Sequence, residues 1–128
     1  MIAGIGTDIV AVERLGNLYE RHGERALVKL LAPAERSDFE KARDPARFLA
    51  KRFAAKEAFG KALGIGVAAP ATLPSISVVH DALGKPAFDY APKLAQHLIE
   101  RGLVAHLSIS DEQDFALAFV VLEYNQAT

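Results

Sequence analysis

The sequence predicts an α+β fold in which helices pack on a mainly antiparallel sheet. In the N-terminal half, apolar residues recur every three or four positions, as they do on the buried face of a helix. Near the C-terminus, two strand-like segments, 104–110 and 115–124, flank a short polar turn. Since 128 residues with a hydrophobic fraction of 51% can bury one core, we expect a single domain over 1–128.

The elements of the N-terminal half follow in order from these patterns. Residues 2–9 are apolar and broken by glycines, which indicates a short strand. Helical spacing over 10–23 predicts a helix that ends at its final glycine, and 24–31 predicts a second, shorter one. A third helix is expected over 33–42, because its first residue is a proline. The N–H groups of a first helical turn have no partner within the helix, so proline loses no hydrogen bond there.

The longest predicted helix spans 45–63. Asp44 is expected to cap its N-terminus, and Pro45 to take the first helical position. The run Gly64-Ile65-Gly66 is expected to end it. This segment therefore has both a start signal and a stop signal.

The C-terminal half predicts strands and one helix. After a loop over 67–74, polar and apolar residues alternate over 75–78, as in a half-buried strand. A turn over 81–86 leads to a short strand at 87–90, and 92–100 predicts a helix. The last strand, 115–124, is apolar on both faces, so we expect it to be central and buried.

Composition excludes several classes of protein. The chain has no cysteine, so it contains neither a disulfide framework nor a thiolate metal site. No apolar run approaches the roughly 20 residues of a membrane-spanning helix, and the N-terminus lacks the basic start of a secretory signal. We therefore expect a cytoplasmic protein with no membrane partner.

Charge is distributed unevenly along the chain. Residues 11–62 contain 12 Lys/Arg and 8 Asp/Glu, whereas the rest of the chain contains 3 and 8. The basic half is either a set of solvated helix surfaces or a face for an anionic partner. Because basic and acidic residues are interleaved and no nucleic-acid-binding motif is present, we expect no nucleic-acid partner.

Two acidic residues in distant segments are candidate metal ligands. Asp8 follows a glycine-rich strand, where a turn or capping role is also open. Glu57 lies four residues before Lys61 on one helix face, either as an ordinary ion pair or as part of a phosphate site. Mg²⁺ keeps waters and substrate phosphates among its oxygen ligands, so one carboxylate from each of two elements suffices for metal-assisted attack on a pyrophosphate.

Two further features are open between structural and functional roles. The amides of Gly64 and Gly66 could approach a phosphate, or these glycines could simply end the helix. His106 shares a strand face with Ser108 and Ser110. It is either a structural histidine or one that binds phosphate or moves a proton.

Three strings occur in order along the chain: GIGTDIVAVER at 4–14, RFAAKEAFGKALGIG at 52–66 and HLSISD at 106–111. With the GKP turn at 84–86, they resemble the holo-acyl-carrier-protein synthases, the short trimeric class of 4′-phosphopantetheinyl transferase, over essentially the whole chain. The resemblance implies the 4′-phosphopantetheinyl transferase fold. It also implies an enzyme that moves the phosphopantetheine arm of coenzyme A to a serine of apo-acyl carrier protein and releases adenosine 3′,5′-bisphosphate.

The resemblance assigns roles residue by residue. Asp8 and Glu57 match the Mg²⁺ ligands, and Lys61 matches the lysine near the pyrophosphate, where it would act as a point charge. The coenzyme A site would also include Gly64, Gly66 and His106, with Arg52 and Lys56 as further candidates for phosphate contact. The base that takes the serine proton stays open among Glu57, a water on the Mg²⁺ and His106.

The resemblance also gives the basic half of the chain a partner, because acyl carrier proteins are small and acidic. Arg14 matches a basic position on the first helix that meets the carrier. Arg21 and Arg25 would add steering charge, and Leu18 an apolar contact. The family is homotrimeric with sites between subunits. One departure is Asp111, where many members carry His, and an acidic side chain is less suited to holding phosphate.

Two other functions would use the same residues. A Mg²⁺-dependent hydrolase of a nucleotide pyrophosphate would need a positioned water and no carrier protein. A non-catalytic module that binds coenzyme A or the carrier protein would show no turnover, and it would tolerate the loss of Asp8 or Glu57.

Overall fold

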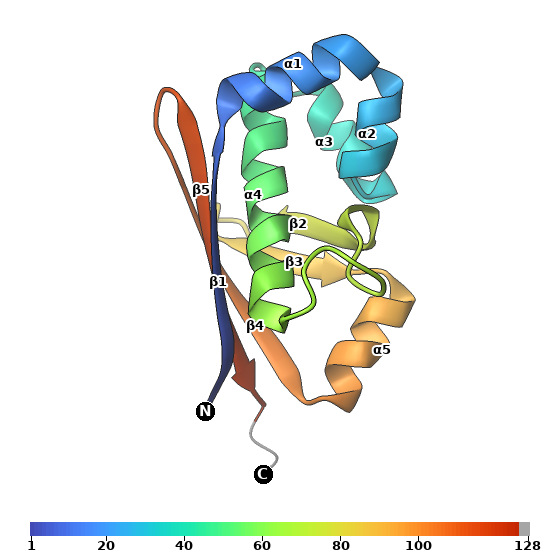
Figure 1. Cartoon of the computed structure of the whole chain (residues 1–128), viewed down its shortest axis with the longest axis vertical. Helices are drawn as coiled ribbons and strands as arrows, with labels where there is room; N and C mark the ends of the chain where they lie inside the picture. Colours follow the sequence, from blue (N-terminus) through green and yellow to red (C-terminus); the bar gives the residue numbers. More distant parts are fainter. Residues whose placement is uncertain (126–128) are drawn as a thin grey trace.

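The molecule is built around one long helix, α4 (Pro45–Leu63) (Figure 1). The computed structural model describes residues 1–125. The helices that accompany α4 are α1 (Val12–His22), α2 (Glu24–Leu30), α3 (Arg36–Glu40) and α5 (Pro92–Glu100). The strands are β1 (Ile2–Ala11), β2 (Ile76–His80), β3 (Pro86–Tyr90), β4 (Leu103–Asp111) and β5 (Phe115–Tyr124). Short 3₁₀ turns occur at Pro33–Glu35 and Leu73–Ser75.

The strand pairs of the described residues are all antiparallel, which confirms the predicted α+β fold. β5 lies between β1 and β4 in a three-stranded sheet, so it is central, as predicted. β2 pairs with β3 in a separate hairpin. The strands therefore form two sheets rather than the one that was expected.

Helix α4 begins and ends where the sequence predicts. The carboxylate of Asp44 accepts a hydrogen bond from the N–H of Arg47 at 3.1 Å and caps the first turn. The helix ends at Gly64, whose φ of +89° is a conformation that favours glycine. The segment 33–42 differs from expectation, because a 3₁₀ turn precedes the short helix α3.

Helix α4 separates the three-stranded sheet from the rest of the molecule. Figure 1 shows the sheet along one side of α4, with α1, α2, α3 and the β2–β3 hairpin on the other sides. The largest fully buried apolar side chains come from α1, α4, α5, β2 and β5: Leu15, Leu49, Phe59, Ile76, Leu94 and Leu122. None of the described helices combines the length and apolar composition needed to cross a bilayer.

Two glycines let β1 approach α4 without intervening side chains. A Cβ atom on Gly4 would overlap the carbonyl oxygen of Ala62, and one on Gly6 would overlap the carbonyl oxygen of Ala58. Because both clashes are with helix backbone, a side chain cannot be accommodated by a rotamer change. Close contact between β1 and α4 therefore depends on glycine at both positions.

Replacing Gly6 by Ala is expected to destabilise the protein by about 1–3 kcal/mol, because β1 must move away from α4 to admit a methyl group. Chemical denaturation of both proteins measures the difference. Gly84→Ala is the control for general glycine effects, since nothing lies within 4 Å of its Cβ direction, although its φ of +87° carries a backbone cost of its own. If Gly6→Ala unfolded at the same denaturant concentration as the wild type, the close packing of β1 on α4 would be contradicted.

On β1 and β5, the outer face of the sheet, which points away from α4, is largely apolar and exposed. It carries large side chains that are 37 to 60% exposed: Ile5, Ile9, Phe115, Leu117 and Phe119. Only the inner residues of β5, among them Ala118 and Val120, are buried. The prediction that β5 is buried on both faces is therefore wrong for the single chain, and its hydrophobic outer face lies open to solvent.

Candidate functional site

Strand β1 and helix α4 bring Asp8, Glu57 and Lys61 together. Asp8 lies on the inner face of β1 between the buried residues Gly6 and Val10, so its side chain faces α4. The ammonium group of Lys61 donates to the carbonyl oxygen of Thr7 at 3.0 Å and pairs with Asp8 Oδ1 at 3.2 Å. Two segments about 50 residues apart in sequence thus form one charged site at the β1 edge of the sheet.

The two carboxylates of this site influence each other's ionisation. Burial raises the pKa of Glu57 above its ordinary value, and the negative charge of Asp8 raises it further. Lys61 and Arg14 act in the opposite direction but do not cancel these effects. The two carboxylates therefore lie close enough to repel each other, and burial adds to the cost of ionising Glu57.

The donor set suits magnesium better than a structural zinc. Within residues 1–125, no group of three or more His, Asp or Glu side chains is placed to hold a metal ion. Structural zinc sites use four protein ligands, usually Cys and His. Mg²⁺ commonly takes one or two carboxylates and fills its remaining positions with waters and phosphates, so Asp8 and Glu57 are sufficient.

The two glycines after α4 do not offer free amides. The N–H of Gly64 donates to the carbonyl oxygens of Gly60 and Lys61, both at 3.1 Å, and the N–H of Gly66 donates to that of Gly60 at 3.0 Å. The hypothesis that these amides bind a phosphate is therefore wrong in this conformation, and both close the helix terminus. Any contact of this loop with a ligand would rely on the small size of the glycines.

His106 lies on the opposite face of the sheet from Asp8. Its neighbours Ala105 and Leu107 on β4 point inward and are partly buried, whereas His106 is exposed and its Nε2 lies 2.9 Å from Glu123 Oε1. The structure does not bring His106 to the carboxylate site within one chain. The alternation of β4 correctly predicted that His106 shares a face with Ser108 and Ser110. It did not predict that Asp8 lies on the other face of the sheet.

Arg52 and Lys56, the other predicted phosphate contacts, turn inward toward Glu35. The Nζ of Lys56 is fully buried and reaches Glu35 Oε1 at 2.5 Å, the Leu30 carbonyl at 2.8 Å and the Leu73 carbonyl at 3.0 Å. An ammonium group has three donors, so none remains for a ligand. Lys56 is a structural residue, and the prediction that it contacts phosphate is wrong.

Glu35 accepts hydrogen bonds with both carboxylate oxygens. Oε2 accepts from Arg52 Nη1 at 2.9 Å and from the N–H of Val78 at 3.0 Å, while Oε1 accepts from Lys56 and from the N–H of Ala32. Burial alone would raise the pKa of Glu35, but the charge of Lys56 and these hydrogen bonds outweigh it, so the pKa lies below its ordinary value. This buried cluster joins α4 to β2 and to the segment before α3.

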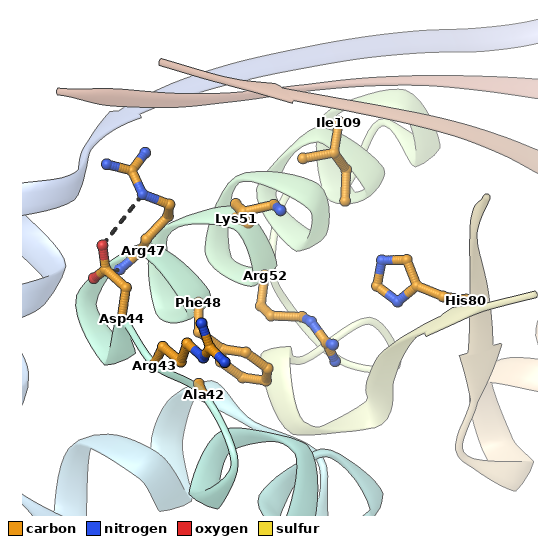
Figure 2. Close-up of a pocket in the computed structure, with 9 residues that line it drawn as sticks. All are labelled: Ala42, Arg43, Asp44, Arg47, Phe48, Lys51, Arg52, His80 and Ile109. Carbon is orange, nitrogen blue, oxygen red and sulfur yellow. Dashed lines mark hydrogen bonds and ion pairs between the residues drawn. The ribbon is translucent and has the colours of Figure 1, made fainter. Parts of the chain in front are cut away.

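A basic pocket of about 270 Å³ opens on the other side of α4 (Figure 2). Its titratable lining, basic except for one aspartate, comes from the residues just before α4, from the first turns of α4 and from β2: Arg43, Asp44, Arg47, Lys51, Arg52 and His80. Figure 2 shows Arg52 and His80 pointing toward each other across it. Burial, together with the positive charges of Arg52 and Lys51, lowers the pKa of His80, as expected in a cationic environment.

The sequence interpretation missed this pocket. Arg43, Arg47 and Lys51 recur every four residues, a spacing that predicts a basic stripe on one face of a helix. No sequence signal joined His80 to that stripe, because it comes from a separate hairpin. The pocket retains Arg52 as a candidate for phosphate contact, since its guanidinium lines the wall while one amino group is held by Glu35 and the Val78 carbonyl.

The predicted partner-binding residues share one surface at α1 and α2. Arg14, Leu18 and Arg21 line one shallow hollow of about 470 Å³. Leu18 also lines a second hollow of about 440 Å³, together with Arg25 and apolar residues of α2. The structure therefore groups three cations around an exposed leucine.

Comparisons with known proteins identify the family of the chain. Residues 4–120 match the family model of the 4′-phosphopantetheinyl transferase superfamily. The chain is 63% identical over 124 residues to a holo-[acyl-carrier-protein] synthase of Dechloromonas aromatica, which covers 97% of this chain and 99% of that protein.

Solved structures show the same similarity in three dimensions. The holo-[acyl-carrier-protein] synthase of Neisseria meningitidis superposes with a TM-score of 0.93 and 48% identity, covering 96% of this chain and 99% of the other. A holo-(acyl-carrier-protein) synthase of Bacillus anthracis, in complex with CoA (3′,5′-ADP), gives 0.84 and 33%, covering 98% and 99%. Near-complete coverage of both chains means that the similarity includes β1 and α4, which carry the carboxylate site. The chain therefore belongs to the holo-acyl-carrier-protein synthases of the 4′-phosphopantetheinyl transferase superfamily.

Proposed function

We propose that this chain transfers the 4′-phosphopantetheine group from coenzyme A to a serine of apo-acyl carrier protein, with Mg²⁺ held by Asp8 and Glu57. The observation that carries the proposal is the pair of carboxylates on β1 and α4, with the ammonium group of Lys61 3.2 Å from Asp8. Family membership supports the two substrates. The cytoplasmic location stays a prediction that rests on those substrates.

The nearness of two carboxylates supports Mg²⁺ as the cofactor. Two carboxylates that repel each other are stabilised by a cation between them, and hard oxygen ligands suit Mg²⁺. Asp8 and Glu57 would hold the Mg²⁺, which when bound would offset the negative charge that develops on the leaving group.

The remaining roles fall to side chains of the chain itself. Lys61 is 56% exposed, so its ammonium group can contact an incoming phosphate while Thr7 and Asp8 hold it in place. The serine oxygen bonds to the phosphorus that carries the pantetheine arm, and the bond from that phosphorus to the oxygen of adenosine 3′,5′-bisphosphate breaks. The serine proton passes to a base, and of the two candidate side chains, Glu57 lies beside Asp8 within one chain, whereas His106 lies on the other face of the sheet.

The basic pocket is proposed to hold the phosphates at the adenosine end of coenzyme A. Its lining provides the positive charge that a phosphorylated nucleotide requires. However, the pocket is lined by Ile109 of β4, whereas Asp8 lies on β1, and these strands are the two edges of the sheet. One coenzyme A molecule would contact both features most simply where the β1 edge of one subunit meets the β4 edge of the next.

We propose a homotrimer for this reason and because of the outer face of the sheet. The face of Ile5, Ile9, Phe115, Leu117 and Phe119 is apolar and open, as expected of a surface that is buried between subunits. Sedimentation velocity centrifugation tests the assembly, and a monomer at the concentrations used for assays would contradict it.

Reversing the charge of Arg14 is expected to weaken binding of the carrier protein more than binding of coenzyme A. We expect Arg14→Glu to raise the KM for apo-acyl carrier protein by about tenfold, because repulsion replaces steering of an acidic partner. The KM for coenzyme A should change much less. Arg101→Glu is the matched control, since this exposed arginine follows α5 at the other end of the molecule (Figure 1). Equal losses for both substrates would exclude α1 as the docking surface.

Intact-protein mass spectrometry tests the proposed function directly. Apo-acyl carrier protein is incubated with coenzyme A, Mg²⁺ and this protein, and a gain of one phosphopantetheine mass is expected. The gain should disappear with EDTA, return with added Mg²⁺ and be absent when the carrier serine is replaced by alanine. Release of adenosine 3′,5′-bisphosphate without any carrier would favour the hydrolase, and binding of coenzyme A without turnover would favour the binding module.

A further inference from the structure

The cations of the basic pocket are not equally available to a ligand. Arg47 Nη1 donates to Asp111 Oδ2 at 3.0 Å and to the Glu112 carbonyl at 2.5 Å, and Nη2 donates to the Gln113 carbonyl at 2.8 Å. Its Nε donates to Asp44 at 3.3 Å. Figure 2 shows the guanidinium of Arg47 pointing away from His80. Arg47 is therefore bound to the β4–β5 turn, and it contributes charge rather than direct contacts to the pocket.

Lys51 is held much more loosely. Its ammonium group lies 3.8 Å from Asp111 Oδ1, beyond hydrogen-bond distance, and its side chain is 38% exposed. Asp111 thus has a tightly bound cation on one carboxylate oxygen and a loosely bound one on the other. A phosphate that enters the pocket can compete for Lys51, while Arg47 stays with the turn.

We propose that Asp111 is an internal counter-anion that limits the affinity of the basic pocket for phosphate. The inference rests on the proposed function, which assigns this pocket to the adenosine end of coenzyme A. Asp111 attracts Lys51 and repels an incoming phosphate, so it weakens binding of coenzyme A and of the bisphosphate product alike. It also fixes the geometry of the turn through Arg47. Weaker binding of the product shortens the time for which it occupies the site after transfer.

The Asp111→Asn variant tests this role by removing the charge and keeping an oxygen that can accept from Arg47. At low salt we expect the Kd for adenosine 3′,5′-bisphosphate, measured by isothermal titration calorimetry, to fall about threefold to tenfold. The difference should shrink at high salt, because part of the effect is screened. Asp111→Glu keeps the charge and should bind like the wild type.

Two further variants separate the role of Asp111 from general changes in charge. Glu112→Gln removes a neighbouring charge whose side chain makes no ion pair or hydrogen bond among the described residues, so it should change the Kd less. Lys51→Ala should weaken binding of adenosine 3′,5′-bisphosphate. In the Lys51→Ala background, Asp111→Asn should lower the Kd less, because Asp111 and the phosphate no longer compete for Lys51.

The outcomes distinguish this inference from the proposed function. An unchanged or higher Kd in Asp111→Asn, with Lys51→Ala still weakening binding, overturns the counter-anion role alone. An unchanged Kd in Lys51→Ala overturns both that role and the assignment of the pocket. Failure of the transfer itself would appear separately, as an unmodified carrier protein in the mass spectrum of the wild-type reaction.

Discussion

The Glu57→Gln variant is expected to lose about 10²- to 10³-fold in kcat/KM for transfer while its free energy of unfolding stays the same or rises. Glutamine has nearly the same shape, so packing on α4 is preserved. The change removes one of two anionic ligands and weakens Mg²⁺ binding. It also removes repulsion from Asp8, which contributes to the raised pKa of Glu57, so the folded state has no reason to become less stable.

Opposite effects on activity and stability separate a metal site from a structural ion pair. If Glu57 only paired with Lys61, stability would fall slightly and transfer would be little affected. Asp8→Asn should resemble Glu57→Gln, and excess Mg²⁺ should restore part of the activity of either variant. Glu40→Gln, at the exposed end of α3, controls for the loss of one negative charge. Full transfer by Glu57→Gln at limiting Mg²⁺ would exclude Glu57 as a ligand.

The sequence predicted local structure well because its signals are local. Asp44 before α4, Pro45 at its first position and Gly64 after it each act within a single turn, and the observed helix spans the predicted 45–63. The alternation of β4 likewise predicted which residues share a face. The grouping of strands into two sheets depends on pairing between distant segments, which no local pattern encodes.

The candidate site was predicted unevenly for the same reason. The three matching strings identified Asp8, Glu57 and Lys61, and the structure brings these together. They did not reveal that Lys56, one residue before Glu57, points to the opposite side of α4. The sequence did not predict that Glu35 is the buried partner of Lys56. Glu35 lies two residues after Pro33, at the start of a helical segment, where a glutamate is usually exposed in the first turn.

Glu35 is the residue whose replacement is expected to cost the most stability. We expect Glu35→Gln to lower the free energy of unfolding by about 3–5 kcal/mol, measured by chemical denaturation. The two cations that it neutralises, Arg52 and Lys56, would remain buried without an opposite charge. Glutamine has one accepting oxygen in place of two, so at least two of the four hydrogen bonds to this side chain are also lost.

The exposed pair of Glu24 and Arg36 provides the matched control. Glu24 is 67% exposed, so Glu24→Gln should cost no more than about 1 kcal/mol although it also breaks an ion pair with arginine.

The pH dependence of stability gives a second check on the role of Glu35. Because the pKa of Glu35 is lowered on folding, its stabilisation is complete above the ordinary glutamate pKa of about 4.3 and is lost as the pH falls through the lower, folded-state value. The stability of the wild type should therefore approach that of Glu35→Gln on acidification. If the difference in unfolding free energy between the wild type and Glu35→Gln stays constant with pH, the shape of the side chain, rather than its charge, stabilises the cluster.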